Sequence, residues 1–174
     1  MSINPRSKQY RRGDDYSVSY WWHTLVVFVT VGILSVFPLS ARPLEDRTFP
    51  AKHVVVIDAD TIAYGSLRIR LKGISAPERG HHDYGAGREY LVGLIAASEK
   101  VHCNLTGETT YRRRVARCQL IDVDEAVVDM QRAIVSSGHA RGCPRYGGWR
   151  YILDEVGKSR SLPFPVYCWG FSVW

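Results

Sequence analysis

A short cationic stretch, LRIRLK at residues 67–72, has the spacing needed to present several positive charges on one surface. In a β-strand, successive side chains point to opposite faces. Arg68, Arg70 and Lys72 therefore share one face, and the aliphatic side chains between them pack on the other. The sequence predicts a strand that packs through one face and can hold a phosphate group on the other.

Acidic residues stand on both sides of this strand. Asp58 and Asp60 follow a run of β-branched residues, and the turn sequence YGS at 64–66 then leads into the cationic strand. This pattern predicts a β-hairpin that ends in acids. Glu78 comes after Gly73 and Pro77, so we expect it on a bent loop just beyond the strand. A carboxylate pair, a cationic strand and a lone glutamate thus lie within one short stretch of the chain.

Two sequence motifs in this stretch, DADT and RIRLKGISAPE, resemble the thermonuclease (staphylococcal nuclease-like) family. Members of that family typically show a DGDT hairpin followed by an R-L-x-G-I-D-A-P-E strand and loop. Two later pieces extend the resemblance: Tyr84-Gly85 at the start of a helix, and YRRRVA at 111–116, which is similar to the family's Y-G-R-x-L-A strand. The resemblance covers about residues 52–141.

The resemblance implies catalytic roles for three residues. In the family two strand arginines grip the phosphate, and Arg70 and Arg113 match them; forked guanidinium donors suit phosphate oxygens better than lysine does. Glu78 matches a glutamate credited with acting as a base on the attacking water. These three are the candidate catalytic residues. The candidate substrate-binding residues are Arg68, Lys72 and Tyr111.

The resemblance also implies a calcium ion at the hairpin. Asp58 and Asp60 match the hairpin acids, of which the second is a calcium ligand in the family. Ser75 stands where the family has its second metal-binding aspartate. We expect this neutral hydroxyl to weaken the calcium site, because affinity depends on the number of charged ligands. The run HHD at 81–83 offers alternative ligands, although adjacent histidines have no preferred metal-ligand spacing here.

The remaining pattern positions these residues in an α+β fold. Besides the hairpin, it predicts strands at 101–105 and 113–121, helices at about 86–98 and 126–137, and a short amphipathic helix at about 149–158. The resemblance narrows this pattern to a five-stranded OB-type β-barrel with about three flanking helices.

The amino terminus has the features of an export signal. Four cations precede an almost uncharged stretch at 21–39, whose most apolar part is short for a membrane-spanning helix. Ala41 is a small residue at a suitable cleavage point. The alternative is an uncleaved signal anchor, in which Trp21-Trp22 lies at the membrane interface. In both cases we expect the rest of the chain outside the cytoplasm, either periplasmic or secreted, or anchored to the membrane by this segment.

The domain organisation follows from these segments. Residues 1–41 are the signal peptide or anchor, and residues 42–51, with two prolines and mixed charge, are expected to be a linker. The nuclease-like domain is predicted at 52–141. Residues 142–174 form a C-terminal extension.

Cysteine usage agrees with export. The four cysteines, Cys103, Cys118, Cys143 and Cys168, all lie after the signal and have no C-x-x-C spacing, so zinc is disfavoured. Cys103 and Cys118 fall in two predicted neighbouring strands, and we pair them for that reason. Cys143 and Cys168 are then paired by elimination. This second bridge would tie the C-terminal extension back to the domain.

Three functions are consistent with the sequence. The first is an exported, metal-dependent endonuclease or phosphodiesterase acting on DNA or RNA, weakened by Ser75. The second is a non-catalytic OB module that binds a polyanion; the net charge of +6 is compatible with such a partner. The third comes from the family resemblance, since exported nuclease-like proteins are also assigned to exopolysaccharide (succinoglycan) biosynthesis. No protein partner can be inferred, and membrane contact is expected only through the amino-terminal segment.

Overall fold

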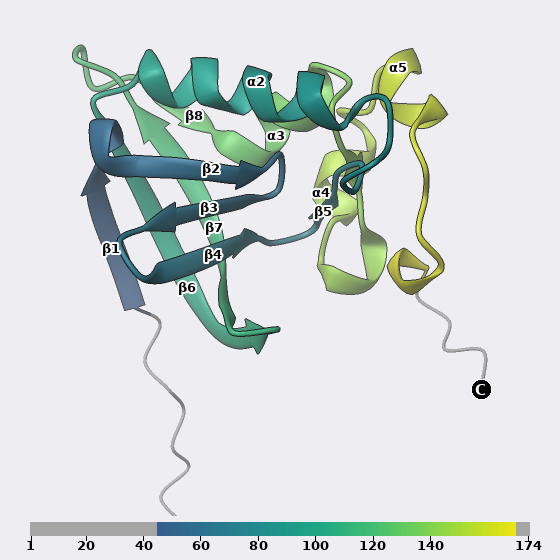
Figure 1. Ribbon diagram of the computed structural model, residues 1–174, viewed down its shortest axis with the longest axis horizontal. Helices are drawn as coiled ribbons and strands as arrows, with labels where there is room; N and C mark the ends of the chain where they lie inside the picture. Colours follow the sequence, from purple (N-terminus) through teal and green to yellow (C-terminus); the bar gives the residue numbers. More distant parts are fainter. Residues whose placement is uncertain (1–44, 170–174) are drawn as a thin grey trace, which may run out of the picture. The chain divides into compact units, whose positions relative to one another are not determined.

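A mixed β-sheet with helices packed on it makes up most of the computed structural model, which describes residues 45–169 (Figure 1). Its strands pair in the order β1-β6-β7-β4-β3-β2, and β8 pairs with β7. All these pairs are antiparallel except β4 with β7. The strands are β1 (Glu45–Pro50), β2 (Val54–Asp58), β3 (Thr61–Tyr64), β4 (Leu67–Leu71), β6 (Lys100–Thr110), β7 (Arg113–Ile121) and β8 (Val127–Asp129). A separate two-stranded sheet joins β5 (Ile74–Ser75) to β9 (Arg141–Gly142).

The predicted hairpin and its cationic strand are confirmed. Strands β2, β3 and β4 form a continuous antiparallel meander, and Gly65 has the positive φ of 56° that the turn after β3 requires. In β4, Ile69 and Leu71 are buried, whereas Arg68 is exposed and Arg70 is half-buried. The alternation therefore separates a core face from a cationic face.

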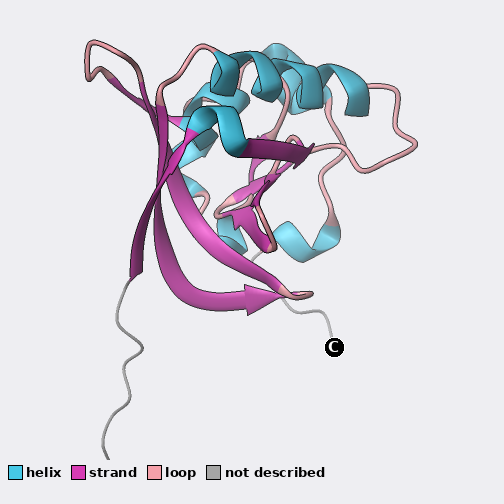
Figure 2. Ribbon diagram, turned by 60° about the vertical axis from the view of Figure 1, so that its left-hand side comes forward, coloured by secondary structure: helices cyan, strands magenta, loops and turns pink. Residues whose placement is uncertain are grey.

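The long strand β6 curves along its length (Figures 1 and 2). Its pairing register with β7 shifts between Leu105 and Thr109, which marks a β-bulge or irregularity. An extra residue on one strand bends it and increases its twist.

The helix predicted at 86–98 is α2 (Tyr84–Ala96), which packs on β2 through the buried Leu91 and Ile95 (Figure 1). The other helices of the described range are α3 (Met130–Ser136), α4 (Trp149–Ile152) and α5 (Gly157–Ser161), with 3₁₀ turns η1 (Ala51–His53), η2 (Pro144–Tyr146) and η3 (Val166–Cys168). Within residues 45–169, none of the helices combines the length and apolar character needed to cross a membrane.

The predicted linker at 42–51 is wrong over its described part. Residues Glu45–Pro50 form the edge strand β1, which pairs with β6 and buries Phe49 in the core. Pro50 stands at the end of β1, where a missing N–H is tolerated. Mixed charge also suits an edge strand that exposes most of its side chains to water. A polar segment with two prolines was therefore not sufficient reason to expect a linker.

The helix predicted at 126–137 begins later than expected. Val127 and Val128 belong to β8 and are exposed, because these β-branched residues extend the sheet beside β7. Asp129 then caps the helix by accepting a hydrogen bond from the Arg132 N–H at 3.0 Å. The helix thus starts at Met130.

The helix predicted at 149–158 is also wrong as a single element, because a turn at 153–156 separates α4 from α5. Glu155 in this turn is buried, and its carboxylate accepts a hydrogen bond from the Gly142 N–H at 2.9 Å. That contact ties the turn to the small sheet. A continuous helix would lose it.

Both predicted disulfides are present. Cys103 and Cys118 face each other across β6 and β7, with their Cα atoms 4.1 Å apart. Cys143, which directly follows β9, is bonded to Cys168 in η3, with a Cα separation of 4.7 Å. The C-terminal extension is therefore covalently tied to the domain.

The fold class is confirmed as α+β. The strand pairs of the described residues make an open path from β1 to β2 and no closed barrel. The predicted export signal lies outside the described residues.

Candidate functional site

An open pocket of about 570 Å³ lies where β4 and the loop after it meet the end of the β6–β7 hairpin and the C-terminal extension. We call this pocket the arginine groove. Its lining residues are Arg70, Leu71, Lys72, Gly73, Ile74, Glu78, Glu108, Thr109, Thr110, Tyr111, Arg113, Val115, Cys143, Tyr146 and Tyr167. Both predicted phosphate-binding arginines and the predicted base are thus brought to one pocket.

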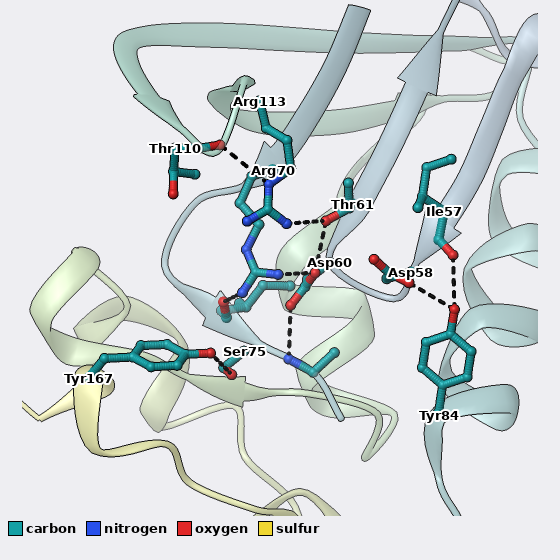
Figure 3. Close-up of polar contacts among 12 residues, drawn as sticks. Ile57, Asp58, Asp60, Thr61, Arg70, Ser75, Tyr84, Thr110, Arg113 and Tyr167 are labelled. Carbon is teal, nitrogen blue, oxygen red and sulfur yellow. Dashed lines mark hydrogen bonds and ion pairs between the residues drawn. The ribbon is translucent and has the colours of Figure 1, made fainter. Parts of the chain in front are cut away.

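Arg70 is held at the base of the groove by an ion pair with Asp60 (Figure 3). Its second terminal nitrogen donates to the Ile74 carbonyl at 3.3 Å. Asp60 is almost completely buried, and burial raises the pKa of its carboxyl above the ordinary value. Arg70, the N–H of Ala76 and the hydroxyl of Thr61 oppose this rise in pKa. The guanidinium is consequently fixed in position, with its charge balanced by a carboxylate.

Arg113 reaches the same place from β7. Its Nη1 donates to the Thr61 hydroxyl at 3.4 Å, and its Nε donates to the Thr110 carbonyl at 3.4 Å. The Thr61 hydroxyl in turn donates to Asp60 at 3.0 Å (Figure 3). Among the described residues Arg113 makes no ion pair with a carboxylate. Its positive charge is therefore available to an anion in the groove.

The other charged lining residues occupy the rim. Lys72 is ion-paired with Glu108, so its charge is already balanced. Glu78 is exposed, as expected for a loop residue, and only its backbone carbonyl is used in a described hydrogen bond, with the His81 N–H. A carboxylate that lines the same groove as two arginines is a suitable base for activating water next to a bound phosphate.

Ser75 lies beside the groove in the small sheet and is buried. Its Oγ is 3.3 Å from the hydroxyl oxygen of Tyr167 in η3 (Figure 3). The Cys143–Cys168 bridge holds this turn in place. Two hydroxyl groups in contact, those of Ser75 and Tyr167, therefore lie where a second metal-binding aspartate was expected from the resemblance.

Asp58 is turned away from this network. Its carboxylate accepts a hydrogen bond from the Tyr84 hydroxyl at 2.8 Å, which joins the hairpin to the start of α2 (Figure 3). The same hydroxyl lies 3.3 Å from the Ile57 carbonyl. Asp58 thus has a structural partner of its own.

Two predicted substrate-binding residues lie at different distances from the pocket. Arg68 is exposed on β4 and does not line the groove. Tyr111 lines it and is 91% exposed, at the tip of the β6–β7 hairpin. Tyr111 and Arg112 both have positive φ, of 45° and 63°. Such a turn favours residues without a Cβ atom, so both side chains adopt a rarely used backbone conformation.

These residues do not fit a calcium ion. Calcium takes about six to eight oxygen ligands, with several carboxylates among them. One oxygen of Asp60 accepts from both Arg70 and Thr61, and the other accepts from the Ala76 N–H at 3.1 Å. Ser75 adds no charge. The expected principal ligand, Asp60, is already neutralised by the Arg70 guanidinium.

The histidine pair after Glu78 makes a small cluster at the start of α2. Potential ligand atoms of His81, His82 and Asp83 lie within 4.8 Å of one another. Asp83 already contacts the His82 ring nitrogen at 2.8 Å, and its N–H donates to the His81 ring at 3.2 Å. The cluster is explained by these local contacts.

Sequence reasoning missed Tyr146 and Tyr167, the aromatic wall of the groove, whose ring centroids are 6.4 Å apart. It also assigned no role to Thr61, although this residue is part of the DADT motif. The second disulfide was the available signal for Tyr167, because Tyr167 directly precedes Cys168 and the bridge holds this part of the chain next to the domain.

Comparison with known proteins gives a partial similarity. No family model matches the chain. The chain is 33% identical over 96 residues to the succinoglycan biosynthesis protein ExoI of Rhizobium meliloti (strain 1021). The alignment covers 49% of this chain and 48% of the relative, so the chain spans about half the length of the curated relative it matches.

Proposed function

We propose that this protein is an exported, thermonuclease-like protein that binds phosphodiester-linked polyanions in the arginine groove and hydrolyses them slowly. The observation that carries the proposal is Arg113. It projects into an open pocket beside Arg70, and its described hydrogen bonds go only to neutral oxygens. A phosphate would therefore gain a charge-assisted contact without displacing a carboxylate from this arginine.

The hydrolytic part of the proposal rests on Glu78. This carboxylate is exposed in the same groove, where it can accept a proton from water attacking a bound phosphodiester. The guanidinium groups would stabilise negative charge on the phosphate oxygens in the transition state. We expect slow turnover because Arg70 is already neutralised by Asp60 and Ser75 contributes no charge.

The strand order supports an OB-type arrangement as part of this proposal. An OB fold is a five-stranded, partly open Greek-key barrel that binds its ligand across one face. The path β2-β3-β4-β7-β6 contains five strands, and residues of β4 and β7 line the groove. Barrel closure would additionally require β2 to pair with β6.

Export is supported by the two disulfides. Bridges of this kind form and persist in oxidising compartments and are rare in the cytosol. All four cysteines are paired. We therefore propose that the domain works in the periplasm or outside the cell.

The test of this function combines binding and cleavage. We expect fluorescein-labelled single-stranded DNA to bind the purified, oxidised protein, and Arg113→Ala to weaken binding by roughly tenfold. The slope of log affinity against log salt should fall by about 0.7 for Arg113→Ala, as expected for the loss of one phosphate contact. Arg88→Ala is the matched control, because Arg88 is an exposed arginine of α2 outside the groove.

Cleavage is measured with the same DNA on denaturing gels. Glu78→Gln should lower the rate by about 10²-fold and leave affinity nearly unchanged, because it removes the base without removing a cation. Equal cleavage by the unmodified protein and Glu78→Gln would contradict the assignment of the base. Equal binding by Arg113→Ala and Arg88→Ala would contradict the assignment of the groove.

A second candidate function is a role in exopolysaccharide (succinoglycan) biosynthesis, which is favoured by the similarity to ExoI. In this case the groove would bind an acidic polysaccharide through the same arginines. Competition of labelled DNA by purified succinoglycan tests this alternative. Displacement at lower concentrations than those of unlabelled DNA would favour the polysaccharide.

A further inference from the structure

Tyr167 occupies a defined position in the groove although it lies near the end of the described chain. It belongs to the 3₁₀ turn η3, and the adjacent Cys168 is bonded to Cys143. Its hydroxyl contacts Ser75, and its ring is next to Tyr146. A covalent bridge, a polar contact and an aromatic contact thus orient one side chain towards the groove.

The Ser75–Tyr167 pair has one hydroxyl proton that is free for a further hydrogen bond. Two hydroxyl groups carry two protons, and the contact between them uses one. Ser75 is 2% exposed, whereas Tyr167 is 42% exposed and lines the groove. When Ser75 donates to Tyr167, the phenolic proton is free to donate to an anion.

The buried carboxylate of Asp60 needs no added cation, because its charge is already balanced by Arg70. Asp60 is buried behind the groove residue Arg70, which is ion-paired with it and neutralises it. Thr61 and Ala76 occupy two more of its acceptor positions. A divalent ion would have to compete with these contacts, and it would find a hydroxyl at position 75.

We propose that Tyr167 is an anion-binding residue and that the arginine groove binds phosphodiesters without a divalent cation. Arg70 replaces the metal as the partner of Asp60, Arg113 supplies the unbalanced charge, and Tyr167 donates the additional hydrogen bond. The Cys143–Cys168 bridge is required because it positions Tyr167. This inference rests on the proposed function of the groove.

The test measures binding of fluorescein-labelled oligothymidylate by fluorescence anisotropy, at constant ionic strength, with either EDTA or calcium chloride present. We expect the dissociation constants in the two buffers to agree within about twofold. Tyr167→Phe, which removes only the hydroxyl, should weaken binding about tenfold in both buffers, as expected for a lost hydrogen bond to a charged group. Tyr90→Phe is the matched control, because Tyr90 packs against His139 and does not line the groove.

The bridge is tested with the double variant Cys143→Ser, Cys168→Ser. We expect the same loss as for Tyr167→Phe, and no further loss when the three substitutions are combined, because all act through one hydroxyl. Circular dichroism and thermal melting identify variants that fail to fold. Tyr167→Phe alone keeps the bridge and decides the question if the double variant unfolds.

The outcomes separate this inference from the proposed function. Binding that is lost in EDTA and restored by calcium overturns cation independence, even if Arg113→Ala also abolishes it. Equal affinities for Tyr167→Phe and Tyr90→Phe overturn the role of Tyr167. Absence of binding by the unmodified protein in both buffers, or binding that is insensitive to Arg113→Ala, overturns the proposed function and this inference with it.

Discussion

A chain of hydrogen bonds connects the two arginines of the groove. It runs from Arg113 through the Thr61 hydroxyl to the Asp60 carboxylate, which also holds Arg70. Thr61 is the only neutral member of this chain and is 1% exposed. The position of Arg113 therefore depends on a buried hydroxyl that carries no charge.

We expect Thr61→Val to weaken DNA binding about fivefold to tenfold, because it removes the hydroxyl that both accepts from Arg113 and donates to Asp60. Thr61→Ser, which keeps the hydroxyl, should bind nearly as well as the unmodified protein. Fluorescence anisotropy at fixed salt provides the comparison. Equal affinities for the valine and serine variants would show that Arg113 is positioned by other contacts.

Ser75→Asp introduces a carboxylate at the position where the resemblance implies a second metal-binding aspartate. A second acid near Asp60 should create measurable calcium affinity, because calcium sites are tuned by the number of charged ligands. The same substitution should weaken DNA binding in EDTA by like-charge repulsion. Isothermal titration with calcium chloride and anisotropy in EDTA measure the two effects. Calcium binding by the unmodified protein that is as tight as by Ser75→Asp would contradict our description of this site.

The sequence predicted the charged residues of the groove better than its neutral ones. Arg70, Arg113 and Glu78 were identifiable because their types and spacing belong to a recognisable motif, and all three line the groove. Tyr167 does not belong to that motif, since it lies far along the chain and reaches Ser75 only through folding; the predicted second disulfide was its one signal. Side chains brought in by a disulfide carry no local periodic signal.

At the scale of the elements, α3 is connected to the sheet by one polar side chain. Gln131 is fully buried; its Oε1 accepts from the Cys118 N–H at 3.1 Å, and its Nε2 donates to the Ala116 carbonyl at 3.2 Å. The amide continues the hydrogen-bond pattern of β7 where β8 has ended. We expect Gln131→Leu to lower the free energy of unfolding by about 2 kcal/mol, because it leaves a buried N–H without a partner.

Urea denaturation followed by circular dichroism measures this effect. Arg132→Leu is the matched control, because it places the same side chain at the neighbouring, exposed position of α3. A loss in the control as large as that in Gln131→Leu would assign the effect to the helix as a whole. The buried amide would then contribute little.

Tyr151 in α4 affects stability at high pH. Its side chain is fully buried, its hydroxyl has no partner in the described part of the chain, and burial raises its pKa to about 12 from the ordinary 10.0. The unfolded chain therefore ionises first as the pH rises. The stability supplied by the neutral phenol is complete below pH 10 and declines between pH 10 and about 12.

We expect Tyr151→Phe to be more stable than the unmodified protein by about 1 kcal/mol at pH 7, because a buried hydroxyl without a partner is removed. Its stability should also decline less between pH 10 and 12. Thermal melting across this pH range measures both. Parallel pH profiles for the two proteins would show that Tyr151 does not titrate as described.

Element boundaries were predictable where apolar periodicity was strong and not where β-branched or polar residues join a sheet edge. Helix α2 and strand β4 were recognised from the spacing of buried residues such as Leu91 and Ile69. Strands β1 and β8 were not, since an edge strand buries few side chains and its sequence differs little from that of a linker or a helix start.

At the scale of the whole molecule, both disulfides and the cationic amino terminus favour an exported protein. We expect the mature chain to begin near Arg42, with Cys103 bonded to Cys118 and Cys143 bonded to Cys168. Amino-terminal sequencing of the periplasmic or secreted form and peptide mapping without reduction measure these two features. Recovery of the full-length chain in the membrane fraction would favour the signal anchor.

The place of β1 at the edge of the sheet has a consequence for the time course of folding. As an exported chain leaves its translocation channel, β1 emerges early, but Glu45 pairs with Leu105 and Pro50 pairs with Lys100, so the partner strand follows only after β2, β3, β4 and α2. Contacts between residues so distant in sequence form slowly. Until β6 emerges, β1 is an unpaired strand that could associate with other chains. Its polar sequence, EDRT followed by a single buried Phe49 and a proline, keeps this waiting segment soluble.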